Sequence, residues 1–326
     1  MLFDEQGKAK ARFIKDSPNY CYGKMNKRDE ILKVYSKVKK VFPFKGYMDC
    51  KIEKYLNIAS IILSEVPRGS KILDLGCGAC DLTAILAMLG YDTIGLDDLR
   101  DPWHLIGRNR ERIINFAKEM GIKLIIEPIE TAKLEENHYD CVLLIDILEH
   151  SLNPRTLLNK AIATLKVNGL LLIETSNCAA LAKRIMLLLG KWRSPSVNFI
   201  YFNNLGIYRG HVREYTVSEL KWMLKQSGLV DIKVRMTNHE IKSLICERKG
   251  IYKIIPRFYD LLSNIYPNFR DTVLIYGRKP KDWKYVSDEE AFILLKRYYQ
   301  HLVKYNLDNE SDEAILLKIK AMSEPA

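Results

Sequence analysis

Two glycines, Gly76 and Gly78, follow a short hydrophobic run, Ile72–Leu75, and precede a helical pattern that begins near Asp81. Glycine allows the backbone to approach a ligand closely and to adopt dihedral angles that are closed to other residues. The free N–H groups at the start of the following helix then face that ligand. The segment Lys71–Cys80 therefore predicts a ligand-binding turn at the end of a strand.

The residues around this turn limit the class of ligand. A dinucleotide-binding turn needs a third glycine at a defined spacing, and residues 79–82 do not supply it. The acidic Asp74 disfavours a pyrophosphate and suits a cationic ligand that carries an ammonium and a sulfonium. About 20 residues later, Asp97 and Asp98 end a second hydrophobic run, where an acid accepts hydrogen bonds from ribose hydroxyls. Asp97 is the preferred contact because it follows the run directly, and Asp98 is the alternate.

Polar residues also follow a later and strongly apolar run, Cys141–Ile145. Asp146, Glu149 and His150 stand where that strand should end, and ligands of open α/β sheets bind at the carboxyl ends of strands. The preferred interpretation of Glu149 and His150 is that they fix the loop. The alternative is a catalytic role for His150.

A second histidine lies in the segment Gly210–Thr216, just before the helical pattern Ser218–Ser227. This position predicts a loop above the carboxyl edge of the sheet. A histidine has a pKa near neutrality, so His211 is suited to take a proton from a hydroxyl group. Two interpretations stay open: His211 is a general base, or His211 and Arg213 position a lid or the substrate.

The cysteines predict neither a metal site nor a disulfide framework. Cys77 and Cys80 form a CxxC pair, but no second CxxC or histidine pair accompanies it, so we expect no metal site. Seven scattered cysteines in a chain of 326 residues suggest reduced thiols in the cytoplasm. The first residues lack an apolar signal core, and no run approaches the ~18 apolar residues that a membrane span requires.

Short apolar runs alternate with helical patterns between residues 71 and 276. Such alternation is typical of a parallel sheet that helices cover on both faces. We expect the α/β class, with a doubly wound and mostly parallel seven-stranded sheet. The expected strands are residues 71–75, 92–96, 123–127, 141–145, 169–174, 230–236 and 272–276.

The remaining segments are expected to be extensions and insertions of this sheet. Residues 1–66 predict a helical N-terminal extension, and residues 281–326 predict a helical tail. The sheet domain then occupies residues 67–280. It contains a lid insertion after the fifth strand at 176–210 and a second, helical insertion at 241–267.

Four segments together resemble the class I, Rossmann-like methyltransferase family, which uses S-adenosylmethionine. They are Ile72–Gly78, Gly95–Asp97, Tyr139–His150 and Val167–Thr175. The order of the family's motifs is followed from about residue 50 to residue 278, and the nearest group is the small-molecule methyltransferases that include those of quinone biosynthesis.

This resemblance implies a set of cofactor contacts. Asp74, Leu75, Gly76 and Gly78 would line the methionine end of S-adenosylmethionine, and Asp97 or Asp98 the ribose. Asp146 and Ile147 would face the cofactor. Pro128 stands where the family often has an acid for the adenine, so Ile129 or Glu130 takes that place. Cys80 stands where the family usually has glycine.

The acceptor is expected to be a small molecule, glycan or lipid that is methylated on a hydroxyl. The insertion Ala179–Trp192 is apolar and flanked by basic residues, which favours a hydrophobic lid, with peripheral membrane contact as the alternative. Asn177, just before this segment, and Arg184 and Leu189-Gly190 within it resemble the insertion of enzymes that belong to cell-surface glycan or lipid pathways. A net charge of +11 leaves an RNA methyltransferase open, although no nucleic-acid-binding module is visible. A non-catalytic S-adenosylmethionine-binding protein is the third interpretation.

Overall fold

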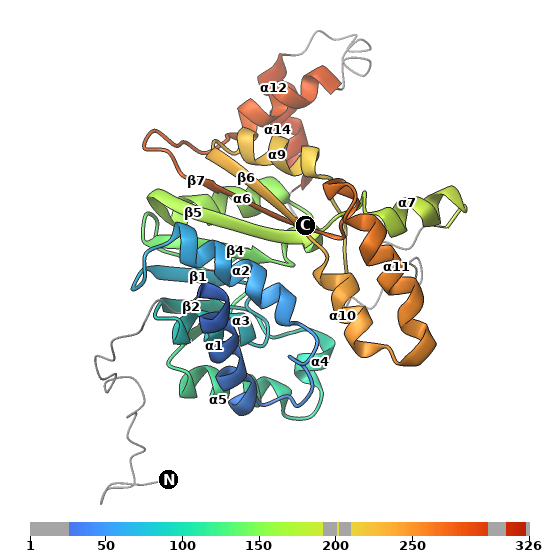
Figure 1. Ribbon diagram of the computed structural model, residues 1–326. Helices are drawn as coiled ribbons and strands as arrows, with labels where there is room; N and C mark the ends of the chain where they lie inside the picture. Colours follow the sequence, from blue (N-terminus) through green and yellow to red (C-terminus); the bar gives the residue numbers. More distant parts are fainter. Residues whose placement is uncertain (1–25, 192–200, 202–209, 299–310, 324–326) are drawn as a thin grey trace, which may run out of the picture.

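A seven-stranded sheet forms the centre of the molecule (Figure 1). The computed structural model describes residues 26–191, 201, 210–298 and 311–323. The strand order is β3-β2-β1-β4-β5-β7-β6, and β7 runs antiparallel to both of its neighbours. The other pairs, from β3 across to β5, are parallel. The strands are β1 (Lys71–Leu75), β2 (Asp92–Leu96), β3 (Lys123–Ile125), β4 (Tyr139–Ile145), β5 (Leu165–Ser176), β6 (Val230–Thr237) and β7 (Thr272–Arg278).

The central strands are continuous apolar runs because helices cover them on both faces. Two buried hydrophobic clusters lie on opposite sides of the sheet. One cluster includes residues of the helices α1 (Lys27–Val41), α2 (Ile52–Glu65), α3 (Asp81–Met88) and α5 (Asn109–Glu119). The other includes residues of α6 (Pro154–Thr164) and α9 (Val217–Gln226). The expected α/β class and the mostly parallel seven-stranded sheet are confirmed.

The N-terminal helices α1 and α2 pack against the same hydrophobic cluster as α3 and α5. Ile58 and Ile62 of α2 are fully buried, and the Tyr35 hydroxyl of α1 donates to the Met48 carbonyl oxygen at 2.6 Å. Both helices lie between residues 27 and 65, within the expected N-terminal extension. The extension thereby brings the first turn of α2 to the carboxyl edge of the sheet, as the ion pair between Lys54 and Asp146 shows.

Two insertions lie beyond the carboxyl edge of the sheet (Figure 1). The first holds α7 (Leu181–Leu188) after β5, and the rest of the expected lid falls largely outside the described residues. The second, between β6 and β7, holds α10 (His239–Glu247) and α11 (Ile254–Ser263). The short helices are α4 (Pro102–Leu105), η1 (Leu148–His150), η3 (Gly250–Lys253) and η4 (Pro267–Phe269), and the tail contains α12 (Asp288–Tyr298) and α14 (Asp312–Ser323).

The expectation that all cysteines are reduced thiols is wrong for one pair. Cys50 and Cys246 form a disulfide, with their Cα atoms 5.6 Å apart. Cys50 lies two residues before α2 and Cys246 lies in α10, and 196 residues of sequence separate the two cysteines. Only the packing of α10 against α2 brings them together.

The apolar helices of the structure are short. Within the described part of the chain, no helix has both the length and the apolar character needed to cross a bilayer.

Candidate functional site

The glycine turn joins the carboxyl ends of β1 and β2. The N–H groups of Gly76 and Cys77 donate to the Leu96 carbonyl oxygen, at 2.7 and 3.1 Å. The Gly78 N–H donates to Asp97 Oδ2 at 2.9 Å. Asp97 thus lies against the turn, whereas Asp98 accepts a hydrogen bond from the N–H of Arg100 in its own loop. Of the two acids Asp97 and Asp98, the structure therefore places Asp97, the preferred one, beside the glycines.

The residue after this turn adopts a left-handed conformation. Cys80 has φ +60° and ψ +21° at the start of α3, a region that glycine enters without steric cost. This explains why glycine is the usual residue there in the resembled family. The Sγ atoms of Cys77 and Cys80 are 3.6 Å apart, and both side chains are buried.

Asp74 is a buried acid directly behind the turn. Its side chain is 3% exposed, and Thr83 Oγ donates to its Oδ2 at 2.6 Å. Burial raises the pKa of Asp74 to about 7, because a low-dielectric environment disfavours the charged carboxylate. Leu75, the next residue, packs its side chain into the hydrophobic core. A cation bound next to such an acid favours its ionised form.

Apolar side chains from two other loops cover Gly76. A Cβ added to Gly76 would lie 2.0 Å from Ile147 Cδ1 and 3.8 Å from Ile129 Cδ1. Gly76 also has φ +76°, which strains any residue that carries a Cβ. Ile129, Ile147 and Gly76 are therefore neighbours, as their assignment to one site requires.

Four ionisable groups meet at the carboxyl ends of β4 and β5. Lys54 of α2 forms an ion pair with Asp146, and its Nζ lies 3.8 Å from Glu174 Oε1. His239 places Nε2 3.0 Å from the same oxygen. Glu174 is fully buried, and burial raises its pKa to about 8. The Asp146 carboxylate expected to face the cofactor is thus directed at a lysine of the N-terminal extension.

Burial and neighbouring charges together shift the pKa values of these ionisable groups. Burial acts to raise the pKa of Asp146, but the neighbouring Lys54 ammonium lowers it overall. Burial likewise opposes the charge of Lys54, yet Asp146 and Glu174 raise the pKa of that lysine. Burial lowers the pKa of His239. Lys54 and Asp146 are therefore a charged pair, next to a histidine that is neutral at physiological pH.

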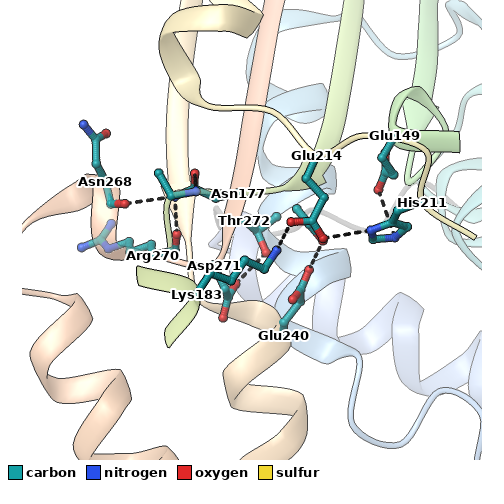
Figure 2. A network of polar contacts seen from close by, with 12 residues as sticks. Glu149, Asn177, Lys183, His211, Glu214, Glu240, Asn268, Arg270, Asp271 and Thr272 are labelled. Atoms are coloured by element: carbon teal, nitrogen blue, oxygen red, sulfur yellow. Dashed lines mark hydrogen bonds and ion pairs between the residues drawn. The ribbon is translucent and has the colours of Figure 1, made fainter. Parts of the chain in front are cut away.

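A second polar group lies where the sequence predicts catalytic histidines (Figure 2). His211 Nδ1 is 2.9 Å from Glu214 Oε1, and His211 Nε2 is 4.0 Å from Glu149 Oε1. The rings of His150 and His211 pack edge to face, with their centroids 4.9 Å apart. Glu214 also forms an ion pair with Lys183 of α7. The structure thus brings both predicted histidines together and connects them, through Glu214 and Lys183, to the insertion that holds α7.

Backbone contacts hold the His211 loop in place. The carbonyl oxygen of Glu149 accepts the N–H of Val212 at 2.7 Å, and Tyr215 forms a bridge to Asn177 at the end of β5. The loop then enters α9 through a capping box, in which Thr216 accepts the N–H of Glu219 at 3.2 Å. His211 is therefore positioned by both of its flanks.

Ionisation in this second group follows from burial and contact. The hydrogen bond to Glu214 raises the pKa of His211. Burial, followed by repulsion from Asp146, raises the pKa of Glu149 to about 7. Glu149, His150 and His211 each offer one ligand atom, and these atoms lie within 4.8 Å of one another. A carboxylate and two imidazoles of this geometry could also hold a divalent metal ion, a capacity that the CxxC pattern does not predict.

Sequence reasoning missed Lys54, Glu174, His239 and Glu214. Lys54 carried a faint signal, because it is a lone basic residue in the strongly apolar helix Ile52–Glu65. Glu174 carried another, as an acid that ends an apolar strand. No local pattern distinguishes His239 or Glu214, whose partners lie on other segments of the chain.

Comparisons with known proteins identify the family of this chain. A family model described as a methyltransferase domain matches residues 44–234. Ubiquinone biosynthesis O-methyltransferases of Rickettsia prowazekii and Photobacterium profundum are 30% and 33% identical over 112 residues. That segment is 33% of this chain and 40% and 45% of those proteins, so the match spans less than half the length of these curated relatives.

Among solved structures, a methyltransferase of Thermotoga maritima is similar at 16% identity and a TM-score of 0.46. It is described as S-adenosylmethionine-dependent and as a possible histamine N-methyltransferase. The match covers 78% of this chain and 100% of that one. The family model matches more than half of the 326 residues of this chain, so the chain belongs to the methyltransferase-domain family.

Proposed function

We propose that this protein transfers a methyl group from S-adenosylmethionine to a hydroxyl on a small-molecule, glycan or lipid acceptor. The observation that carries the proposal is the contact between the Gly78 N–H and Asp97 at the joined ends of β1 and β2. The O-methylation named for the relatives in ubiquinone biosynthesis supports a hydroxyl acceptor. Membership in the methyltransferase-domain family supports the reaction class.

The residues at the turn fit this methyl donor. A Cβ placed on Gly78 would meet no atom within 4 Å, so open space lies in front of that glycine. Asp74 supplies a carboxylate for a cationic ligand, and Asp97 has lone pairs left for ribose hydroxyls after accepting from Gly78 and Leu99. Ile129 and Ile147 supply an apolar wall beside the glycines. When bound, S-adenosylmethionine supplies an electrophilic methyl group on a sulfonium.

The contribution of the protein is to hold the acceptor and to remove its proton. Orientation in line with the donor can account for much of the rate of such a displacement. We propose that His211 Nε2 takes the proton of the acceptor hydroxyl, because Glu214 contacts Nδ1 and fixes the orientation of the ring. Lys183 forms an ion pair with Glu214 and so holds that carboxylate beside His211. Glu149, at 4.0 Å from Nε2, stabilises the imidazolium that forms.

Two measurements test the proposal. Calorimetry should show binding of S-adenosylmethionine and of S-adenosylhomocysteine. Incubation with methyl-labelled cofactor and fractionated cell extract should then place the label in a small-molecule or lipid fraction. Label in the RNA fraction would overturn the acceptor assignment, and the absence of binding to either cofactor form would overturn the function as a whole.

A further inference from the structure

The helix α11 turns its polar side toward the protein. The Tyr259 hydroxyl donates to the Phe269 carbonyl oxygen at 3.0 Å. The Asn238 amide donates to Asp260 Oδ1 at 2.9 Å and to Ser263 Oγ at 2.7 Å. Ser263 is completely buried. Hydrogen bonds, and not an apolar stripe, therefore attach this helix to the rest of the protein.

The opposite side of α11 is apolar and exposed. Ile254, Ile255, Phe258 and Leu261 are 64%, 81%, 60% and 66% exposed. A surface helix of a globular protein normally buries its apolar side and exposes its polar side. This helix does the reverse, so its apolar side is available for contact with something outside the described chain.

The exposed apolar surface continues on both sides of α11 and onto α7. Ile251 and Tyr252 precede the helix, and Ile265 follows it, with exposed fractions of 73%, 70% and 76%. Leu188 of the neighbouring α7 is 86% exposed. The helices α7 and α11 touch each other and lie beyond the carboxyl edge of the sheet (Figure 1). We call the exposed apolar side chains of residues 187–189 and 251–266 the apolar tip.

Basic residues surround the apolar tip. Residues 248–270 contain five Lys or Arg and one acid, and that acid is Asp260, which is hydrogen-bonded on the inner side of α11. Residues 179–191 contain three Lys or Arg and no acid, and one of the three, Lys183, pairs with Glu214. Two copies that met through this surface would bring like charges together, which opposes self-association. An anionic lipid surface instead complements both the apolar side chains and their basic surround.

We infer that the apolar tip inserts into the headgroup and acyl boundary of an anionic lipid membrane. The outer side of α11 and the end of α7 enter the interface, and the flanking lysines and arginines contact the lipid headgroups. Lys183 of α7 pairs with Glu214, which in turn contacts His211. Docking through the tip therefore holds the His211 loop close to the membrane, where a lipid-borne acceptor resides. Membrane binding itself does not depend on the proposed methyl transfer.

Vesicle sedimentation tests the inference with the full chain. The protein should sediment with vesicles of phosphatidylcholine and phosphatidylglycerol, and much less with phosphatidylcholine alone. Phe258→Asp and Leu188→Asp should each weaken binding to the mixed vesicles by about tenfold or more, because a charged group replaces an apolar one in the interface. Val41→Asp is the matched control, since Val41 is 56% exposed on α1 and should leave binding unchanged.

Three results would overturn it. The first is no sedimentation of the original chain with the mixed vesicles. The second is equal binding by the Phe258→Asp and Val41→Asp variants. The third is a stable dimer in sedimentation velocity that Phe258→Asp converts to a monomer, which would assign the tip to a second copy. Calorimetry with S-adenosylmethionine on Phe258→Asp separates this inference from the proposed function, because cofactor binding should be retained.

Discussion

The N–H of Gly78 donates a hydrogen bond to Asp97 Oδ2 across 2.9 Å, and this contact joins the end of β1 to the end of β2. Asp98 is the next residue along the chain, yet its carboxylate accepts from Arg100 instead. Two adjacent acids therefore have different surroundings, which makes them a matched pair for mutation.

Asp97→Ala should weaken S-adenosylmethionine binding by roughly 10- to 100-fold, the usual loss for a hydrogen bond to a charged group. Asp98→Ala is the control, and calorimetry should show less than a severalfold change for it. Equal losses in both variants would contradict the assignment of the ribose contact to Asp97.

Binding of the cofactor should strengthen as the pH rises through about 7. The reason is the raised pKa of Asp74, about 7, which leaves the carboxyl protonated and neutral below that pH and ionised above it. A cationic ligand prefers the ionised form. In the wild-type protein the dissociation constant for the cofactor should therefore fall between pH 6 and pH 8. A group titrates mostly within about one pH unit on either side of its pKa. The ligand itself also titrates, and it does so equally in the Asp74→Asn variant. Any pH dependence of the dissociation constant that this variant shares with the wild-type protein therefore does not come from Asp74.

Lys54→Met should destabilise the fold by about 1–3 kcal/mol, because it removes a charged partner from the half-exposed Asp146 and from the buried Glu174. The matched control is Lys242→Met. The side chain of Lys242 is 42% exposed, against 18% for Lys54, and it pairs with Glu53 at 3.4 Å. Pairs of exposed side chains contribute about 0–1 kcal/mol. Urea denaturation of both variants gives the two free energies of unfolding. Similar values for the two would argue against Lys54 as the buried counter-charge.

His211→Gln should lower kcat by about 10²- to 10⁴-fold, the range for loss of a general base, while cofactor affinity stays unchanged. The activity of the original chain should rise with pH as His211 loses its proton. Glu214→Gln should move that rise to lower pH, since the hydrogen bond to Glu214 is what raises the pKa of His211. A pH profile that Glu214→Gln does not shift would remove His211 from proton transfer and leave it a role in positioning.

Reduction of the chain should lower its melting temperature, because the Cys50–Cys246 disulfide restricts the unfolded state over 196 residues. A loss of about 2–4 kcal/mol is typical of such a link. The double variant Cys50→Ser and Cys246→Ser should melt at the same temperature with and without reductant. Peptide mapping without reduction should also yield one cross-linked pair that contains both cysteines, and its absence together with an unchanged melting temperature would speak against the disulfide.

Local patterns accounted for the framework of the fold. The expected strands 71–75 and 92–96 have the observed bounds of β1 and β2, because continuous apolar runs bounded by turn residues leave few other structures open to them. β5 was expected at residues 169–174 and extends over Leu165–Ser176, because pairing with β4 adds Leu165 at one end and pairing with β7 adds Thr175 and Ser176 at the other.

The α/β class, the glycine turn and the acids beside it could all be predicted, because each depends on residues close together along the chain. Tertiary structure decided which acid lies against Gly78, which lysine neutralises Asp146, and which cysteines join. It also decided that α11 faces outward with its apolar side, which periodicity alone cannot show. The physical reason is range: periodicity and turn chemistry act over a few residues, whereas an ion pair, a disulfide or a buried face is set by packing between segments far apart in sequence.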